Sequence, residues 1–327
     1  MKRYSTAKRY STWIGISFLI ASMAGCGPSS TINGAGASFP ASIYQRWFQD
    51  LASQGVRVNY QSVGSGAGVR QLQSGTVDFA ASDIPMKKDE ILKLKHGVIQ
   101  IPMTAGSIAL AYNLQGCTLK LTQPQLSDIF LGKIQNFKQL GCADKPIKVV
   151  VRSDGSGTTA NFTAHLSAIS PEWKTKVGAG KNVKWPTGIG AKGNEGVAAQ
   201  LTQVEGTIGY VESAFVKQPL QAASLTNSAG KLMQPTPANE QEALSSIDLG
   251  PDLTGSNPNP AKGYPIVTFS WILVPASSNG SRQETLVKTF DYMLSDEAQA
   301  KSAGLGFISL PANILARSRA VLTQIKP

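Results

Sequence analysis

The chain has 327 residues and a formal net charge of +11, which comes from 31 Lys and Arg against 20 Asp and Glu. Its basic residues are scattered and form no run interleaved with aromatic residues, which argues against a nucleic-acid partner. A chain of this length can bury about three quarters of the surface of its extended form and is long enough for two lobes. It contains no Cys/His cluster of the kind that predicts a metal site.

The N-terminus is typical of a secretory signal. Four basic residues precede the apolar stretch 13–25, which is shorter than the ~20 apolar residues that span a bilayer. This stretch runs into Met-Ala-Gly-Cys, which resembles the lipobox of bacterial lipoproteins. We therefore expect export, removal of the signal peptide 1–25, lipidation of Cys26 and a short tether at 26–31, with a plain signal peptide as the alternative. Loss of the four basic residues lowers the formal charge from +11 to +7.

Cys117 and Cys142 are the cysteines that remain after Cys26. An even pair in an oxidising compartment is most simply a disulfide, and two buried free thiols are the alternative. On the chain-entropy model, closing this loop stabilises the fold by roughly 3–4 kcal/mol.

The rest of the chain alternates between strand and helix patterns. In chain order, the pattern predicts a strand at 56–60, a helix at 69–73, strands at 77–81 and 108–112, a helix at 122–130, a strand at 147–151, helices at 159–166 and 196–201, a strand at 207–211, a loop at 248–265, a strand at 266–274 and a helix at 283–294. This rhythm indicates an α/β architecture with a largely parallel sheet.

Small polar residues gather at four expected strand ends. They occur at 34–39, 64–65, 82–83 and 152–158. In open α/β sheets ligands bind outside the carboxyl ends of the strands, so these four turns are expected to converge on one site.

The stretch 152–158, Arg-Ser-Asp-Gly-Ser-Gly-Thr, admits three interpretations: an anion cradle at a helix N-terminus, a serine nucleophile or an ordinary polar turn. A nucleophilic Ser156 needs a base, and the chain has only His96 and His165. His165 lies about two helical turns beyond Ser156, and no G-x-S-x-G elbow surrounds that serine. The chain also lacks the G-x-G-x-x-G and Walker motifs of nucleotide sites. Anion binding accounts for more of the pattern.

Several further motifs occur in order: GAGASFP at 34–40, VGSGAG at 63–68, TVDFAASD at 76–83, FLGKIQNF at 130–137, VVVRSDGSGTT at 149–159 and VKWPTGIGAKGNEG at 183–196. Together they resemble the PstS family, the phosphate-binding proteins of bacterial high-affinity phosphate ABC transporters. The similarity extends over nearly the entire mature chain. It implies a type II periplasmic-binding-protein fold, in which two α/β lobes joined by a hinge close over one phosphate in the cleft.

The resemblance also implies the binding residues. An aspartate accepts the proton of phosphate, an arginine donates charge-assisted bonds, and a second aspartate, here Asp154, holds that arginine in place. Hydroxyls and backbone N–H groups complete the site. The residues that match are Ser38, Phe39, Ser65, Asp83, Arg152, Ser156, Gly157 and Thr158.

From the resemblance we expect an exported, monomeric receptor without enzymatic activity, metal or cofactor, which delivers phosphate to a transmembrane permease and contacts the membrane only through its lipid anchor. Lobe I is expected to hold residues 32–113 plus 268–327, and lobe II residues 114–267. The alternatives are a receptor for another tetrahedral anion such as sulfate or molybdate, a secreted phosphatase or hydrolase that uses Ser156, and a subunit that contacts a sensor.

Overall fold

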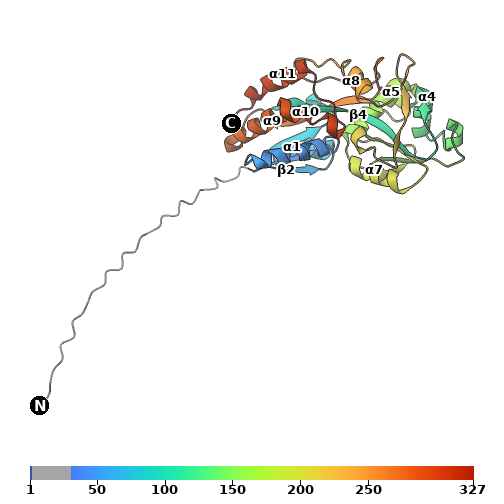
Figure 1. Cartoon of the computed structure of the whole chain (residues 1–327). Coiled ribbons are helices and arrows are strands. Elements are labelled where there is room, and N and C mark those ends of the chain that lie inside the picture. The colour runs from blue at the N-terminus through green and yellow to red at the C-terminus, as the bar shows by residue number, and fades with distance from the viewer. Residues whose placement is uncertain (2–30) are drawn as a thin grey trace.

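The computed structural model describes Met1 and residues 31–327. Apart from Met1, the expected signal peptide lies outside the described residues, as do Cys26 and all of the expected tether except Thr31. The described chain forms two α/β lobes, as the sequence predicts. Helices α1, α9, α10 and α11 surround one lobe, α4, α5 and α7 belong to the other, and strand β4 passes between them (Figure 1).

One large sheet runs through both lobes in the order β2-β1-β3-β12-β4-β8-β6-β7, and β9 also pairs with β4. Its strands are β1 Thr31–Gly36, β2 Arg57–Ser62, β3 Phe79–Ser82, β4 Val98–Asn113, β6 Lys148–Arg152, β7 Ile189–Ala191, β8 Thr207–Glu212, β9 Gln221–Ala222 and β12 Val267–Pro275. A second sheet has the order β11-β10-β5, with β5 Lys120–Leu121, β10 Ser224–Thr226 and β11 Leu232–Met233.

The large sheet is mixed, so the expectation of a largely parallel sheet was wrong. Strand β1 is parallel to β2 and β3, and β6 is parallel to β7 and β8. In the middle, β12 runs antiparallel to β3 and β4, and β4 runs antiparallel to β8. The reason is topological: the two long central strands connect the lobes, whereas the parallel strands belong to the strand–helix–strand units within each lobe.

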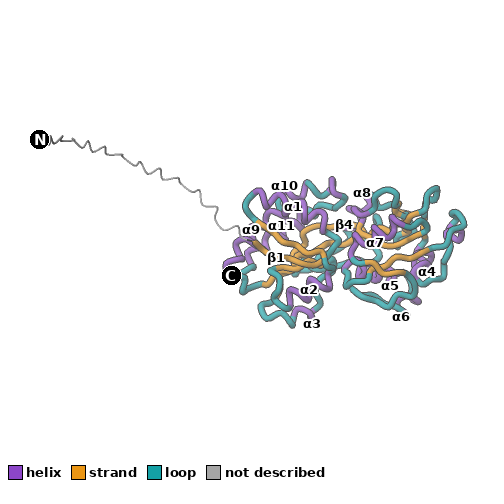
Figure 2. Tube along the Cα trace, turned by 90° about the horizontal axis from the view of Figure 1, so that it is seen from below, coloured by secondary structure: helices purple, strands orange, loops and turns teal. Residues whose placement is uncertain are grey.

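Strand β4 has different neighbours in the two lobes. Residues 98–107 pair with β12, and residues 108–113 pair with β8. The sequence predicted only 108–112, because Pro102 interrupts the strand pattern; the structure accommodates this proline opposite Trp271, next to a shift in register between Ser270 and Trp271. Figure 2 shows the strands in a central layer with helices outside them.

Helices cover the sheet on both sides. They are α1 Ala41–Ser53, α2 Ser65–Gln73, α3 Lys88–Ile91, α4 Gln123–Phe130, α5 Gly157–Ile169, α6 Pro171–Lys176, α7 Gly193–Gln203, α8 Pro237–Leu244, α9 Gln283–Met293, α10 Asp296–Ala300 and α11 Ala312–Ala320. Short 3-10 helices are η1 Phe137–Leu140, η2 Ser213–Phe215, η3 Gly280–Arg282, η4 Ala303–Leu305 and η5 Val321–Gln324.

Helix α1 illustrates how the lobe core forms. Its apolar residues recur every three to four positions, so that Tyr44, Trp47 and Leu51 face the sheet and are fully buried. The indole N–H of Trp47 donates to the carbonyl of Ala298 at 2.9 Å, which attaches the C-terminal helix α10 to the N-terminal helix α1. The two ends of the segment 31–327 therefore share one core.

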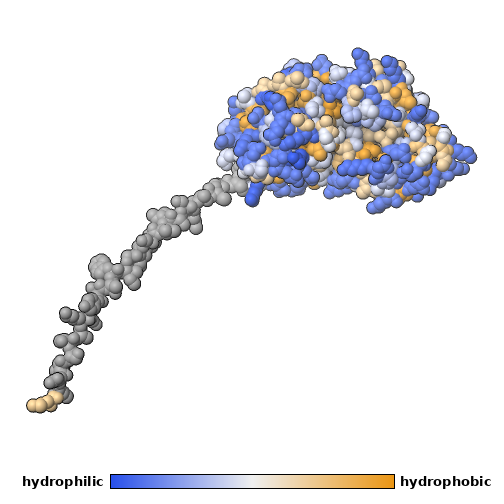
Figure 3. All heavy atoms as spheres, viewed as in Figure 1, coloured by the Kyte–Doolittle hydropathy of each residue, from blue (hydrophilic) through white to orange (hydrophobic). Residues whose placement is uncertain are grey.

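The expected disulfide is confirmed. Cys117 and Cys142 are bonded with their Cα atoms 5.5 Å apart, and the loop between them contains α4. Polar residues dominate the face shown in Figure 3, with apolar areas scattered among them. Between residues 31 and 327, no helix is both long and apolar enough to cross a bilayer.

Candidate functional site

Four strand-end turns meet between the lobes, as the sequence predicts. Ser38 follows β1, Ser65 is the first residue of α2 after β2, Asp83 follows β3, and Arg152 is the last residue of β6. Each of these four residues is at most 4% exposed. The structure therefore gathers polar groups from both lobes into one buried cluster.

Two helix N-termini face each other across this cluster. Helix α5 begins at Gly157, whose backbone N–H donates to Ser65 Oγ, on the first residue of α2, at 3.1 Å. A Cβ added to Gly157 would lie 2.6 Å from Ser65 Oγ and 2.8 Å from the backbone N of Asp83, so this close approach requires glycine. Helix N-termini carry partial positive charge and unsatisfied N–H groups, which suit an anion.

Ser156 lies at the start of α5 and acts as its N-cap. Its Oγ accepts a hydrogen bond from the N–H of Thr159 at 3.0 Å. His165 lies further along the same helix, where its Nδ1 contacts the carbonyl of Pro258 at 2.7 Å. Burial lowers the pKa of His165 to about 4, so its imidazole is neutral at pH 7. The structure does not bring these two residues together as a nucleophile and its base.

Arg152 is held by a bidentate contact with Asp154. Its Nε donates to Oδ1 at 2.8 Å and its Nη2 donates to Oδ2 at 2.6 Å, while the N–H of Gly193 also donates to Oδ1 at 3.0 Å. Burial alone would raise the pKa of Asp154, but the hydrogen bonds and charge of Arg152 outweigh it and keep this pKa below its ordinary value. The remaining nitrogen, Nη1, lies 3.4 Å from Thr158 Oγ1 and faces the cluster.

Asp83 brings a carboxylate to the same place. Its Oδ1 accepts from Ser270 Oγ at 2.9 Å, and its Oδ2 lies 3.4 Å from Thr158 Oγ1. Burial raises the pKa of Asp83 to about 7, although the hydrogen bond from Ser270 and the charge of Arg152 oppose the shift. A carboxylate surrounded by donors can accept a proton from a ligand that still carries one.

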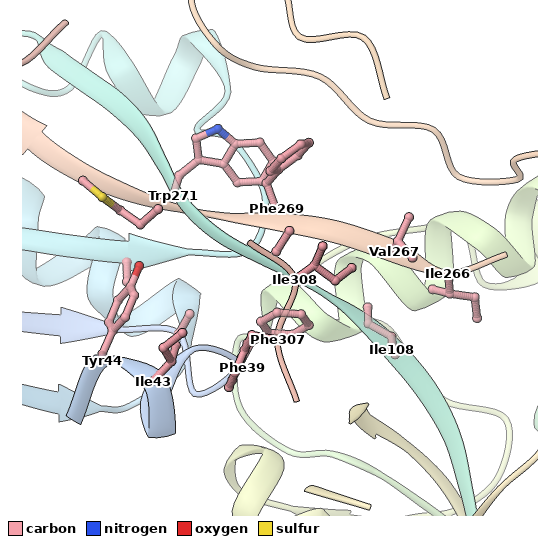
Figure 4. Close-up of a cluster of buried hydrophobic side chains, with 14 of the residues drawn as sticks. Phe39, Ile43, Tyr44, Ile108, Ile266, Val267, Phe269, Trp271, Phe307 and Ile308 are labelled. Atoms are coloured by element: carbon pink, nitrogen blue, oxygen red, sulfur yellow. The ribbon is translucent and has the colours of Figure 1, made fainter. Parts of the chain in front are cut away.

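The ring of Phe39 is buried in the core, although Phe39 directly follows Ser38 in the sequence. Figure 4 shows the ring in a cluster of buried apolar side chains, where it packs edge-on against Phe307 with centroids 6.4 Å apart. The backbone N–H groups of Phe39 and Thr158 make no hydrogen bond to any atom of residues 31–327. Both N–H groups are available to a ligand at the cluster.

Asn194, Ser270 and Asn161 are the residues of the site that sequence reasoning missed. Asn194 donates to the hydroxyls of Ser38 and Thr158, whereas Asn161 Nδ2 donates to the backbone carbonyl of Asp83 at 2.7 Å. The motif at 183–196 contains Asn194, but the helix was expected to begin only at residue 196. Ser270 is one of two polar residues, with Thr268, in a predicted strand that is otherwise apolar, and this was the available signal.

A cavity of about 610 Å³ adjoins the cluster between the lobes and is lined by Asp83 and Asn161 among others. An ion pair between Glu90 of lobe I and Lys181 of lobe II, 2.8 Å long, lies at this cavity. The carbonyl of Lys181 also accepts from the N–H of Ser156 at 2.9 Å. The ion pair therefore links lobe I to the loop that precedes α5.

Among residues 31–327, no three His, Cys, Asp or Glu side chains are grouped as a metal would need. The cluster offers mainly donors: a guanidinium, hydroxyls and backbone N–H groups. Its chemistry is that of an anion site with one acceptor.

Comparisons with known proteins identify the family of this chain. Residues 22–297 match the family model of the PBP superfamily domain. The phosphate-binding protein PstS of Pasteurella multocida is 41% identical to this chain over 314 residues, which cover 89% of this chain and 90% of that protein. PstS of Xylella fastidiosa is 38% identical over 305 residues, which cover 88% of this chain and 83% of that protein.

Solved structures show the same fold. A human phosphate-binding apolipoprotein has a TM-score of 0.76 at 24% identity, over 88% of this chain and 93% of that one. A periplasmic phosphate-binding protein solved with phosphate, PfluDING, has a TM-score of 0.75 at 23% identity, over 89% of this chain and 93% of that one. At such identities these structures support the two-lobed fold alone.

Proposed function

The chain belongs to the PstS family of phosphate-binding proteins, and on that premise we propose that it binds inorganic phosphate between its two lobes and delivers it to an ABC-type permease. Closure of the lobes would expel water and surround the anion with donors from both sides. The expected lobe boundaries, at residues 113 and 268, are part of this proposal.

The roles of the site residues follow from their chemistry. Arg152, fixed by Asp154, donates charge-assisted bonds to the anion, and the N-termini of α2 and α5 add backbone N–H groups and their dipoles. Phe39 donates through its backbone N–H. The proposed contacts with phosphate are Ser38, Phe39, Ser65, Asp83, Arg152, Ser156, Gly157 and Thr158.

One observation carries the proposal: a buried carboxylate, Asp83, stands among these donors. A carboxylate beside an anion is repulsive unless the ligand brings a proton to share. Phosphate near neutral pH carries one or two protons and can donate to Asp83, whereas sulfate carries none. Sites built to bond a ligand's hydroxyl reject an analogue that lacks it by roughly 10⁴–10⁵.

A hydrolase is the alternative in a different functional class. It is not favoured, because Ser156 caps α5 and His165 bonds to Pro258 instead of to a nucleophile. We infer that the chain is a receptor without catalytic activity. The purified protein is expected to show no turnover of p-nitrophenyl phosphate, and turnover that is abolished by Ser156→Ala would refute this inference.

The location of the receptor is also proposed. We infer export by the N-terminal signal, attachment to the membrane through lipidated Cys26 and function as a monomer outside the cytoplasmic membrane. Mass spectrometry of the mature protein would test the anchor. An unmodified N-terminus at any residue other than Cys26 would contradict it.

Titration calorimetry with phosphate, arsenate and sulfate tests the function. We expect tight binding of phosphate and arsenate, which share the protonated tetrahedral form, and weak binding of sulfate. Arg152→Ala should weaken phosphate binding strongly, and Arg152→Lys should restore it only in part, because an ammonium cannot reproduce the planar bidentate fork. Equal affinity for phosphate and sulfate would overturn the assignment.

A further inference from the structure

Asn194 is a fully buried residue near the start of α7 that touches both sides of the anion cluster. Its backbone N–H and its Nδ2 each donate to Ser38 Oγ at 3.0 Å, and its Nδ2 also donates to Thr158 Oγ1 at 3.2 Å. Ser38 follows β1, whereas Thr158 belongs to α5. Asn194 therefore bonds hydroxyls that come from opposite lobes.

The orientation of the Asn194 amide is fixed by a third contact. The backbone N–H of Glu212 donates to Asn194 Oδ1 at 3.0 Å. Because an N–H can only donate, the atom opposite it must be the amide oxygen, and the NH₂ group must face Ser38 and Thr158. One NH₂ proton is therefore donated to Ser38 Oγ and the other to Thr158 Oγ1.

The hydrogen bonds from Asn194 determine where the hydroxyl proton of Ser38 can point. A hydroxyl has one proton and two lone pairs, and the two nitrogens of Asn194 occupy both lone pairs of Ser38 Oγ. The hydroxyl proton must point elsewhere, and it has no acceptor among residues 31–327, although Ser38 is only 1% exposed. A buried donor without an acceptor is costly, and a bound anion would satisfy it.

The hydroxyl of Thr158 is also surrounded by donors. Its Oγ1 accepts from Asn194 Nδ2 at 3.2 Å and lies 3.4 Å from Arg152 Nη1, so both of its lone pairs also face donors. Its proton is left to point toward Asp83 Oδ2, 3.4 Å away, which is the side of the cluster where the anion would lie.

We propose that Asn194 is a positioning residue, which holds the hydroxyls of Ser38 and Thr158 as acceptors on its own side so that their protons point into the anion site. The inference rests on the proposed phosphate function and explains how hydroxyls, which can either donate or accept, become donors there. Without Asn194 each hydroxyl could rotate and present a lone pair to the anion.

A double-mutant cycle in phosphate affinity tests the proposal. Asn194→Ala is expected to weaken phosphate binding about tenfold or more, since loss of one partner of a buried hydrogen bond costs roughly 1–3 kcal/mol. If Asn194 acts through Ser38, the same substitution in a Ser38→Ala background should weaken binding by less than a third of that factor. If the loss of affinity in the double variant equals the product of the losses in Asn194→Ala and Ser38→Ala, the proposal is overturned.

Asn161→Ala is the matched control. Asn161 also joins the lobes through its amide, but its Nδ2 donates to the backbone carbonyls of Asp83 and Gly157, which have no proton to orient. Its effect is therefore expected to multiply with that of Ser38→Ala. Equal coupling of Asn161 and Asn194 to Ser38 would mean that Asn194 only helps the lobes to close, and the proposal would fail.

Asn194→Asp covers the case in which the alanine variant does not fold. The aspartate keeps the size of the side chain and the acceptor for the N–H of Glu212, but it replaces two donors by an oxygen toward which Ser38 and Thr158 would turn their protons. Phosphate affinity within twofold of wild type would overturn the proposal. Failure of the wild-type protein to bind phosphate would instead refute the proposed function.

Discussion

Gly157→Ala tests whether the two lobes must approach as closely as the structure shows. The added methyl would lie 2.6 Å from Ser65 Oγ and 2.8 Å from the Cβ and backbone N of Asp83. Comfortable contacts between such atoms are about 3.5–4.0 Å, so the lobes would have to separate locally by roughly 1 Å. These neighbours are a backbone atom and short buried side chains, which cannot move aside cheaply.

Overpacking of this kind costs about 1–3 kcal/mol. Because the methyl obstructs only the closed arrangement, the cost should appear as a loss of phosphate affinity of about 5- to 150-fold. The unfolding temperature without phosphate should change little, since the lobes can then stay apart. Titration calorimetry and thermal unfolding of the same preparations measure the two quantities.

Gly196→Ala is the matched control for this substitution. Gly196 lies in α7, beside the site, but a Cβ there would meet only atoms of Ala191 at an ordinary 3.8 Å. It should leave phosphate affinity unchanged and stabilise the helix by up to about 1 kcal/mol. Wild-type affinity in Gly157→Ala, or a fall in its phosphate-free unfolding temperature that accounts for the lost affinity, would refute the reasoning.

Three further predictions concern acidity, closure and stability. Because the neutral carboxyl of Asp83 can donate to sulfate and its pKa is about 7, sulfate affinity should rise as pH falls, by about tenfold from pH 8 to pH 5. In Asp83→Asn, calorimetry should show stronger sulfate binding that no longer depends on pH; an unchanged pH dependence would exclude Asp83 as its source. Lys181→Gln should lower phosphate affinity about two- to fivefold at low ionic strength and have little effect in 1 M NaCl, since the ion pair with Glu90 is partly exposed and screened by salt. Wild-type affinity at low salt would contradict a role for this pair in closure. Replacing Cys117 and Cys142 by serine should lower the free energy of unfolding, measured by urea titration, by about 3–4 kcal/mol without changing phosphate affinity. A loss of stability below about 1 kcal/mol would contradict the loop-closure argument.

The convergence of polar turns could be predicted from sequence because it depends on a general property of α/β sheets. Helix starts were predicted less well. Helix α2 begins at Ser65 and α5 at Gly157, earlier than the expected residues 69 and 159, because glycines near a helix start look like turn residues when read one at a time. At α2 the preceding Gly64 has φ +86, which suits the turn but says nothing about where the helix begins.

Ser270 and Asn194 were not predicted as site residues for a different reason. Ser270 lies on β12 and reaches Asp83 across 187 positions of sequence, so only the pairing of β12 with β3 brings them together. Asn194 is placed by four hydrogen bonds to three residues, which lie 18 to 156 positions away in the sequence. No local pattern encodes such distances. Their positions follow from the order of strands, which propensity and periodicity leave open.

The place of β12 in the sheet has a consequence for how the protein folds. This strand lies between β3 and β4, yet it ends at Pro275, long after both neighbours have been synthesised. Until it arrives, β3 and β4 each have an unpaired edge, and such edges invite pairing with other chains. Nascent chains that stop before residue 267 should therefore remain dependent on chaperones. Insertion of β12 is the step that joins the early strands into one sheet, and we expect it to complete the anion site by delivering Ser270 to Asp83.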